Sequence, residues 1–118
     1  YKSTKPNGYY GTTAVKAYPA NPYGLYDMSG NVWQWCSDLY HASYYQEKAK
    51  DGLSINPKGP VSSYDPDEPS MPKCVHRGGA FLCHASYCKG YLITARMKSS
   101  PDASLNHLGF RCVKDVGN

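Results

Sequence analysis

Two cysteines that lie five positions apart form the part of this chain best suited to chemistry. Cys83 and Cys88 lie in the segment Arg-Gly-Gly-Ala-Phe-Leu-Cys-His-Ala-Ser-Tyr-Cys, which spans residues 77–88. A thiol pair at this separation has three uses: a disulfide, a shared soft metal ion, or a redox couple. Each use predicts a different kind of protein, so the surrounding residues must decide between them.

The donor atoms near the pair set the choice of metal. Thiolates are soft ligands that favour Cu(I), Zn(II) or iron–sulfur centres over hard cations. Enough nitrogen and sulfur donors lie nearby for a tetrahedral zinc site, but their spacing fits no standard zinc pattern. These donors are Cys74, His76, Cys83, His84 and Cys88. A structural disulfide stays open as the alternative, and it does not exclude metal binding, because a metal-free pair can oxidise.

Composition restricts the class of protein that carries this pair. The 118 residues predict one domain, near the low end for a sizeable core. The 11 Gly, 9 Pro and 12 Tyr favour a loop-rich fold. The net charge of +4 is mild and scattered, so we expect no nucleic-acid partner, and no apolar run is long enough for a membrane span. Five cysteines is an odd count, so at least one thiol is free, metal-bound or paired elsewhere.

Secondary structure is predicted only in patches. Alternating apolar and polar residues predict a strand over 31–40, and two further strands are expected over 75–81 and 108–113. Ser43 is a fair cap for a short helix over 43–50.

The remaining segments are expected to be irregular. Pro and Gly interrupt 1–24 and 51–72, which predicts turns and a long surface loop. Residues 91–97 fit either a strand or a short helix. The pattern indicates one α+β unit with little regular structure.

Three strings resemble the formylglycine-generating enzyme (sulfatase-modifying factor) superfamily: Tyr-Gly-Leu-Tyr-Asp-Met-Ser-Gly-Asn-Val-Trp-Gln-Trp at 23–35, Arg-Gly-Gly-Ala-Phe at 77–81, and Leu-Gly-Phe-Arg-Cys at 108–112. The string Cys-His-x-Ser-Tyr-Cys at 83–88 is narrower and resembles the catalytic signature of the aerobic branch. The resemblance implies a modified C-type-lectin-like fold. It implies that residues 1–118 are the C-terminal part of a longer domain, and therefore an incomplete domain.

The resemblance implies a specific chemistry for the thiol pair. Cys83 and Cys88 would be the catalytic residues and would bind Cu(I), with Cys88 on the more sheltered side. A cysteine in a Cys-x-Pro-x-Arg motif of a sulfatase would join them, and O2 would be consumed as that cysteine becomes formylglycine. Trp33 and Tyr87 would line the substrate groove. The implied partners are a sulfatase polypeptide and the remaining N-terminal part of the same domain.

The resemblance also implies structural Ca²⁺. Side-chain oxygens at the two ends of one turn, with backbone carbonyls between them, would hold the ion: Asp27, Gly30, Val32 and Gln34. The family commonly has Asn first and Glu last, but both replacements keep an oxygen donor for a hard cation. A plain turn leading into a strand is the alternative. Asn7 and the Tyr9 carbonyl would form part of a second calcium site.

Several positions depart from the family pattern. Ala80 stands where the family usually has Ser, and His107 stands where it tends to have Asn. Because of these departures, the alternative that the chain is a non-catalytic, C-type-lectin-like binding module of the same superfamily stays open. An iron-dependent sulfoxide synthase agrees less well with the sequence, because the chain has no His-x-x-x-His grouping. In the family the cysteine at Cys112 often pairs with one outside this segment, while Cys36 and Cys74 are expected to be ordinary core residues.

Overall fold

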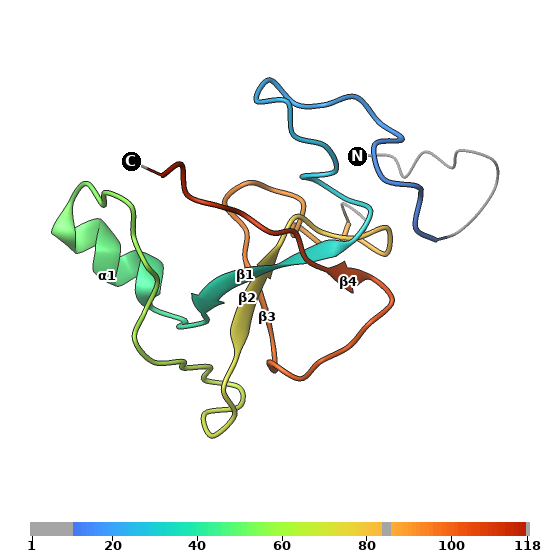
Figure 1. The fold of residues 1–118 in the computed structure, drawn as a ribbon. Coiled ribbons are helices and arrows are strands. Elements are labelled where there is room, and N and C mark those ends of the chain that lie inside the picture. Colours follow the sequence, from blue (N-terminus) through green and yellow to red (C-terminus); the bar gives the residue numbers. More distant parts are fainter. Residues whose placement is uncertain (1–10, 84–85, 118) are drawn as a thin grey trace.

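A small mixed sheet organises the chain, which the computed structural model describes over residues 11–83 and 86–117 (Figure 1). The elements are β1 (Trp33–Leu39), α1 (Tyr44–Asp51), β2 (Cys74–Arg77), β3 (Met97–Ser99) and β4 (Leu108–Gly109). Turns and loops make up the rest of the described residues. One short helix beside a mixed sheet agrees with the expected α+β class. No helix in this part of the chain is long and apolar enough to cross a membrane.

The sheet has the strand order β3-β2-β1-β4. Strand β1 is central: it pairs antiparallel with β2, where Gln34 lies opposite Arg77, and parallel with β4, where Trp33 lies opposite Leu108. The register between β1 and β2 shifts between Trp35 and the end of β1, so the strands bend there. Strands β3 and β4 are the two edges, which leaves one side of each without a sheet partner.

Helix α1 lies beside the sheet and has no buried residue (Figure 1). It begins after Ser43, as predicted, and ends at Asp51 before Gly52. The Ser43 hydroxyl donates a hydrogen bond to the Glu47 carboxylate, and an ion pair of 2.8 Å joins Lys48 to Asp51. Local side-chain contacts of this kind stabilise the helix where packing does not.

The apolar core between β1 and β2 is small. Among the described residues, Trp33, Val75 and Ala80 are the buried apolar side chains. His76 is buried with them, and its ring meets the indole rings of Trp33 and Trp35 edge-on at centroid distances of 4.8 and 5.6 Å. Aromatic packing around one imidazole therefore forms the centre of this core.

An ion pair ties the long loop before β2 to the far edge of the sheet. Asp65 is almost fully buried and accepts a hydrogen bond from the Lys98 ammonium of β3. Lys98 also pairs with Asp67 at 2.7 Å. The loop is joined to the end of β1 as well, through an isolated parallel bridge between His41 and Tyr64.

The structure differs from the predicted strands at three places. The strand expected over 75–81 ends at Arg77, because Gly78 and Gly79 have φ angles of 99° and 72° and turn the chain. The strand expected over 108–113 is paired only at Leu108–Gly109. Residues 91–96 form neither a strand nor a helix, and β3 begins at Met97.

Candidate functional site

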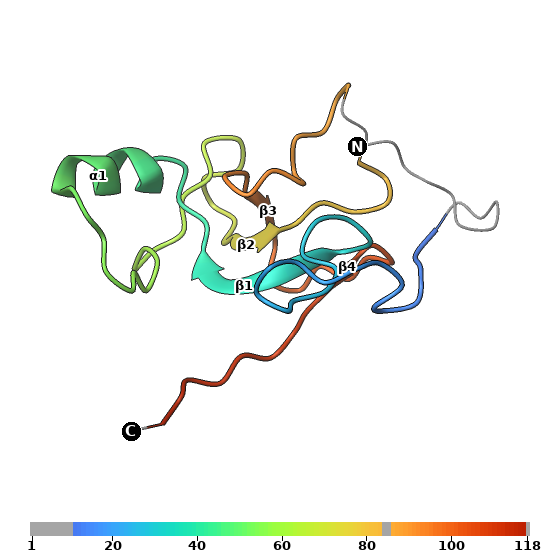
Figure 2. The same ribbon diagram turned by 90° about the horizontal axis from the view of Figure 1, so that it is seen from above.

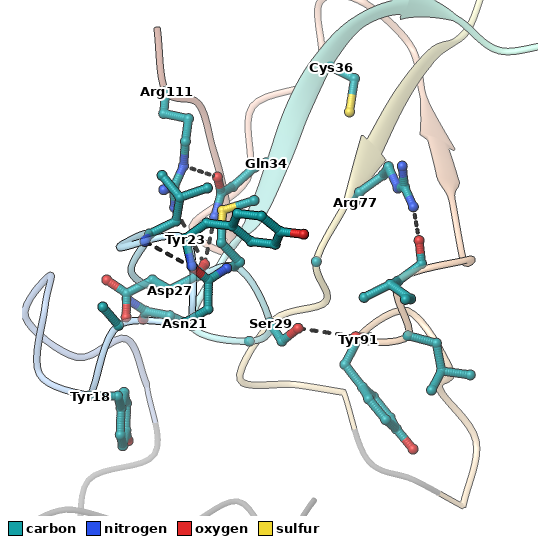
Figure 3. Close-up of a pocket in the computed structure, with 18 of the residues that line it drawn as sticks. Tyr18, Asn21, Tyr23, Asp27, Ser29, Gln34, Cys36, Arg77, Tyr91 and Arg111 are labelled. Carbon is teal, nitrogen blue, oxygen red and sulfur yellow. Dashed lines mark hydrogen bonds between the residues drawn. The ribbon is translucent and has the colours of Figure 1, made fainter. Parts of the chain in front are cut away.

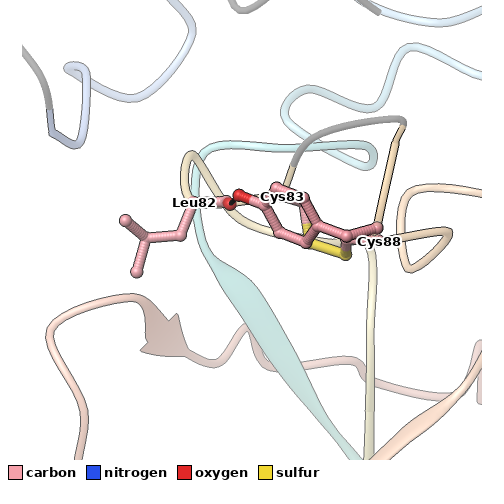
Figure 4. Close-up of a disulfide and its surroundings, with 4 residues drawn as sticks. Leu82, Cys83 and Cys88 are labelled. Carbon is pink, nitrogen blue, oxygen red and sulfur yellow. Dashed lines mark hydrogen bonds between the residues drawn. A yellow bond between two sulfur atoms is a disulfide. The ribbon is translucent and has the colours of Figure 1, made fainter.

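A disulfide joins Cys83 and Cys88, whose Cα atoms are 5.1 Å apart (Figure 4). Both residues are half-buried, so exposure does not single out Cys88 as the more sheltered of the two. Their neighbours Leu82 and Tyr87 are exposed, which puts the pair on a surface loop. The structural alternative considered for the pair is thus the form seen here, and the backbone brings both sulfur atoms to one place.

The donor chemistry of this pair fits copper better than zinc. Once reduced, Cys83 and Cys88 offer two soft thiolates at one point, which suits Cu(I). Within residues 11–83 and 86–117, no group of three or more His, Cys, Asp or Glu side chains could hold a metal ion. His76 is engaged elsewhere, with Nε2 3.0 Å from Ser99 Oγ, and His84 lies outside the described residues. The four-donor zinc hypothesis therefore has no support in the described part of the chain.

The loop that carries the cysteines contacts the core near the loop's C-terminal end. Trp33 lies directly beneath Gly90, and a Cβ atom at Gly90 would overlap the edge of the indole ring. A Cβ at Gly79 would be 3.0 Å from Tyr91 N, so the start and end of the loop also pass close together. The Ser29 hydroxyl donates to the Tyr91 carbonyl at 3.3 Å (Figure 3).

The turn before β1 is hydrogen-bonded to the N-terminal end of the loop. Gly30 N–H donates to the Gly78 carbonyl at 2.7 Å, and Phe81 N–H donates to the Asn31 carbonyl at 2.9 Å. Asn31 is itself fixed, because its side chain exchanges two hydrogen bonds with the backbone of Thr13. The turn over residues 29–31 thus fastens the cysteine loop at both ends.

The residues expected to meet a substrate lie in contrasting places. Tyr87 is 75% exposed, and its hydroxyl donates to the Leu82 carbonyl across the loop. Trp33 is only 6% exposed, so the structure puts it under the loop rather than at an open surface. Ala80 is buried at the base of the loop, where its carbonyl accepts a hydrogen bond from Cys83 N–H at 2.9 Å.

The turn leading into β1 and the start of that strand contain the residues expected to bind calcium: Asp27, Gly30, Val32 and Gln34. Gln34 Nε2 donates to the Asp27 carbonyl at 2.8 Å, and Gln34 Oε1 accepts from the Arg111 guanidinium. Arg111 also donates to the Tyr26 carbonyl at 2.9 Å, and Asp27 Oδ2 accepts from Lys16 N–H. In this arrangement the positive charge of Arg111 lies at Gln34 Oε1, one of the oxygens expected to bind calcium, and its repulsion works against a second cation there. The second expected site, at Asn7 and Tyr9, lies outside the described residues.

The other cysteines are free thiols. Cys36 and Cys74 are half-buried on the two central strands, while Cys112 is exposed. Burial raises the pKa of the Cys36 thiol, and the nearby positive charge of Arg77 opposes this effect. For Cys36 and Cys74, partial burial on a strand agrees with a structural role rather than a reactive one.

A cavity of about 1150 Å³ opens beside the turn that leads into β1 (Figure 3). Its walls come from residues 18–37, from the start and end of the cysteine loop, and from the segment after β4. Arg77 and Arg111 lie in its wall, but backbone carbonyls already accept hydrogen bonds from both. The cavity is distinct from the disulfide, because neither Cys83 nor Cys88 lines it.

Sequence patterns did not single out Gly90 or Asn31 as parts of the site. The role of Gly90 depends on a contact with Trp33, and the role of Asn31 depends on Thr13 and Phe81. His107 contributes through its backbone, since its carbonyl accepts the Trp33 N–H at 2.8 Å. Only glycine can occupy position 90 without overlap, but no local motif marks that requirement.

Comparison with known proteins agrees with the family that the sequence strings resemble. Residues 1–116 match the family described as the sulfatase-modifying factor enzyme 1-like domain. The chain is 41% identical over 112 residues to a formylglycine-generating enzyme of Thermomonospora curvata, covering 95% of this chain and 34% of that protein. It is 42% identical over 113 residues to the mouse formylglycine-generating enzyme, covering 96% of this chain and 27% of that protein.

A solved structure is also similar. Treponema denticola variable protein 1 superposes with a TM-score of 0.55 and 31% sequence identity, over 85% of this chain and 31% of that protein. The chain thus spans about a third or less of the length of each of these relatives.

Proposed function

The chain belongs to the sulfatase-modifying factor enzyme 1-like domain family, and from this premise we propose that it is the thiol-bearing part of a formylglycine-generating oxidase. The substrate would be a sulfatase polypeptide with a cysteine in a Cys-x-Pro-x-Arg motif. The observation that carries the proposal is the meeting of Cys83 and Cys88 on an exposed loop of a chain about 40% identical to enzymes of that name.

In this proposal the two cysteines act as thiolates, so the disulfide must first be reduced by a thiol donor that supplies two electrons and two protons. Cys83 and Cys88 would then hold Cu(I), which supplies a site where the substrate thiol and O2 can meet. Copper and its soft sulfur ligands are chemically matched.

The overall change on the substrate is an oxidation of its Cβ atom. The Cβ–Sγ unit loses two hydrogens to give a thioaldehyde, and water converts this group to the aldehyde with release of hydrogen sulfide. Reduction of O2 to water takes four electrons, of which the substrate supplies two and an added thiol supplies two.

The protein's own residues would position the thiols. Trp33 supports the loop from below at Gly90, and the turn around Gly30 and Asn31 fastens its base. The exposed face of Tyr87 lies beside the pair and is available to a bound peptide. Fixed supports of this kind keep two ligands in register without help from the metal.

Copper binding by the reduced protein tests the proposal directly. We expect Cu(I) to be retained against a chromogenic chelator by the wild type, and retained at least tenfold less well by Cys83→Ser and Cys88→Ser. Cys112→Ser is the matched control, because Cys112 is a free and exposed thiol that is not part of the loop. Equal affinities for all four proteins would contradict the proposed ligand pair.

Turnover provides the second measurement. A synthetic peptide with the Cys-x-Pro-x-Arg motif, incubated with O2, a thiol reductant and Cu(I), should gain an aldehyde that a hydrazide reagent captures. This assay requires the chain together with the rest of a family domain, since the relatives are at least about three times as long.

The second candidate is a non-catalytic binding module. It is favoured by Ala80, a buried methyl where the resemblance implies a hydroxyl, and by the closed disulfide. If the reduced protein binds Cu(I) no better than Cys83→Ser does, the module becomes the better description.

A further inference from the structure

Three buried contacts connect strand β3 to the cysteine loop through His76. His76 is 6% exposed, and its Nε2 lies 3.0 Å from Ser99 Oγ. Its ring meets the indole of Trp33 edge-on at a centroid distance of 4.8 Å. The edge of that indole contacts Gly90, which follows Cys88 by two positions. The contacts therefore run from Ser99 through His76 and Trp33 to the thiol pair.

The backbone joins the same partners a second time. The cysteine loop follows β2, which carries His76, and leads on to β3, which carries Ser99 (Figure 2). Its N-terminal end is fixed as well, because Cys83 N–H donates to the carbonyl of the buried residue Ala80 at 2.9 Å. A movement of the support under Gly90 therefore shifts one end of the loop relative to the other, and with it the two sulfur atoms.

The surroundings of His76 favour the neutral imidazole. Its Nδ1 atom is buried and has no hydrogen-bond partner among the residues that the structure describes. A neutral ring has a single N–H, whereas an imidazolium has two and needs an acceptor at both nitrogens. A charged His76 would thus leave a buried donor unpaired, and burial itself lowers the pKa of His76 from 6.5.

Strands β1 and β3 supply no free negative charge to balance a proton on His76, as far as the described residues show. Strand β1 presents the neutral indoles of Trp33 and Trp35. On β3, the ammonium of Lys98 is paired with Asp65, and Lys98 acts on His76 through a backbone hydrogen bond. The carboxylate of Asp65 is therefore already balanced by another partner.

The remaining titratable neighbours do not stabilise a charged imidazole either. On β2 itself, Arg77 is a cation that hydrogen-bonds to backbone carbonyls, and Cys74 is a free thiol. His107, which precedes β4, adds a repelling positive charge that lowers the pKa of His76 further. A proton on His76 is therefore accommodated when the ring moves toward water or toward a new acceptor.

Movement of that ring changes the support of the cysteine loop. The backbone of Trp33 is fixed, because its N–H donates to the His107 carbonyl at 2.8 Å. Its indole is buried and contacts both His76 and Gly90. When the imidazole leaves its position, the indole loses the ring that keeps it against Gly90.

Loss of this support favours the reduced pair. A disulfide is stable when each thiol meets the other at a high effective concentration, which a firmly supported loop provides. A loosened loop lowers that concentration, so the disulfide becomes easier to reduce. The coupling is reciprocal: opening the disulfide frees the loop and allows His76 to take up a proton at higher pH.

We propose that His76 is a positioning residue for the thiol pair, whose neutral ring holds the cysteine loop through Trp33 and whose protonation favours reduction of the disulfide. The reduction is an exchange in which the Cys83–Cys88 disulfide and two molecules of a thiol such as glutathione give two protein thiols and one external disulfide. Two electrons and two protons pass from the external thiols to the two sulfur atoms. The inference concerns the disulfide alone, and it applies whether or not the pair binds copper.

The exchange equilibrium with glutathione tests the proposal. The 118-residue chain is equilibrated without metal or O2 in glutathione buffers, with a glutaredoxin as catalyst, and peptide mass mapping gives the oxidised fraction of the pair. The exchange releases no net proton while the thiols stay protonated, so its constant should be independent of pH unless another group is coupled to it. We expect reduction to become about threefold more favourable between about pH 7 and pH 5.

Three histidine variants assign the effect. His76→Phe keeps an aromatic ring but takes up no proton, so its constant should change by less than about 1.5-fold over the same range. His41→Phe is the matched control and should behave as the wild type, because half-buried His41 packs on Tyr64 beyond the other end of β1. His107→Asn removes the repelling charge and should keep the pH dependence, with its midpoint at higher pH.

Fluorescence of the unaltered protein gives a measurement that does not depend on how the variants fold. Both tryptophans of the chain, Trp33 and Trp35, meet the His76 ring, and an imidazolium beside an indole quenches its emission. Quenching by acid should therefore have a lower midpoint pH in the oxidised protein than in the reduced protein.

Four results would each overturn the proposal. The first is a pH-independent exchange constant in the wild type, and the second is the wild-type pH dependence in folded His76→Phe. The third is loss of that dependence in His107→Asn or His41→Phe, which would assign it to another histidine. The fourth is an equal midpoint of quenching in the two redox forms.

Discussion

The indole ring of Trp33 and the backbone of Gly90 are in direct contact, so tightly that the ring edge occupies the space of a side chain at position 90. Trp33 belongs to the central strand, and Gly90 follows Cys88 by two positions. This contact joins the core of the sheet to the loop that carries the thiol pair.

Gly90→Ala should therefore destabilise the protein. The added methyl group overlaps a ring that is itself buried and cannot move freely, so we expect a loss of about 1–3 kcal/mol in the free energy of unfolding. Denaturant titration followed by tryptophan fluorescence measures it. Gly11→Ala is the control, because no atom lies within 4 Å of a Cβ at Gly11, and its effect should stay within about 0.5 kcal/mol. Equal effects would show that Trp33 is free to move.

The buried imidazole of His76 should make stability depend on pH. Burial lowers the pKa of His76 from its ordinary value of 6.5, a backbone hydrogen bond involving Lys98 opposes this, and the charge of His107 adds to it. As pH falls below about 6.5, the unfolded chain takes up the proton before the folded protein does. Stability should thus decrease between 6.5 and the lower folded pKa, by up to about 1.4 kcal/mol per pH unit.

Replacement of the imidazole isolates this effect. His76→Phe keeps an aromatic ring against Trp33 and Trp35 but cannot take up a proton. Urea titrations at pH 7.5 and 5.0 should show a smaller difference in unfolding free energy for the variant than for the wild type. An identical difference in both proteins would assign the pH dependence to other groups.

Two carboxylates that share Lys98 should contribute very differently to stability. Asp65 is 1% exposed, whereas the side chain of Asp67 is 78% exposed. Asp65→Asn should lower the unfolding temperature by more than about 5 °C, and Asp67→Asn by less than about 2 °C. Equal shifts in thermal melts would show that burial of Asp65 does not matter.

The same pair predicts behaviour in acid. Burial works against the charged form of Asp65, but hydrogen bonds from Lys98 and from Asp67 N–H outweigh it, so the pKa of Asp65 is lowered from 3.8. The stabilisation by this carboxylate is then present above about pH 3.8 and is lost as pH falls through the lower folded pKa. Asp65→Asn should lack this loss in melts recorded below pH 4.

Arg111 should oppose calcium binding at the turn before β1. Its guanidinium uses Gln34 Oε1 and adds a positive charge beside the expected ligands. Arg111→Gln should therefore tighten Ca²⁺ binding at least tenfold in isothermal titration, because ligand charge sets the affinity of such sites. Lys114→Gln removes the same charge from a position outside the turn and should change affinity little. Weaker binding by Arg111→Gln would mean that the arginine supports the calcium site.

Local patterns in the sequence were enough to predict β1, α1 and the proximity of the two thiols. Alternation marked the strand, Ser43 marked the start of the helix, and a separation of five residues keeps Cys83 near Cys88. Each of these depends on neighbours in the chain.

Features that depend on distant contacts were not predictable in the same way. The end of β2 follows from the close approach of Gly78 to the Met28 carbonyl, where a Cβ would be 3.1 Å away. The engagement of Gln34 by Arg111 joins residues 77 positions apart. The oxidised form of the thiol pair depends on redox conditions, which the sequence does not encode.

The cysteine loop leaves the sheet at Gly78 and comes back beside its own start at Tyr91, and both points are hydrogen-bonded to the same three-residue turn. Its two ends are therefore fixed independently of what lies between them. The length and sequence of the segment between these fixed ends can therefore diverge, or be exchanged by design, while the strands beneath keep their pairing. The scaffold can then survive the loss, or the replacement, of the chemistry it carries.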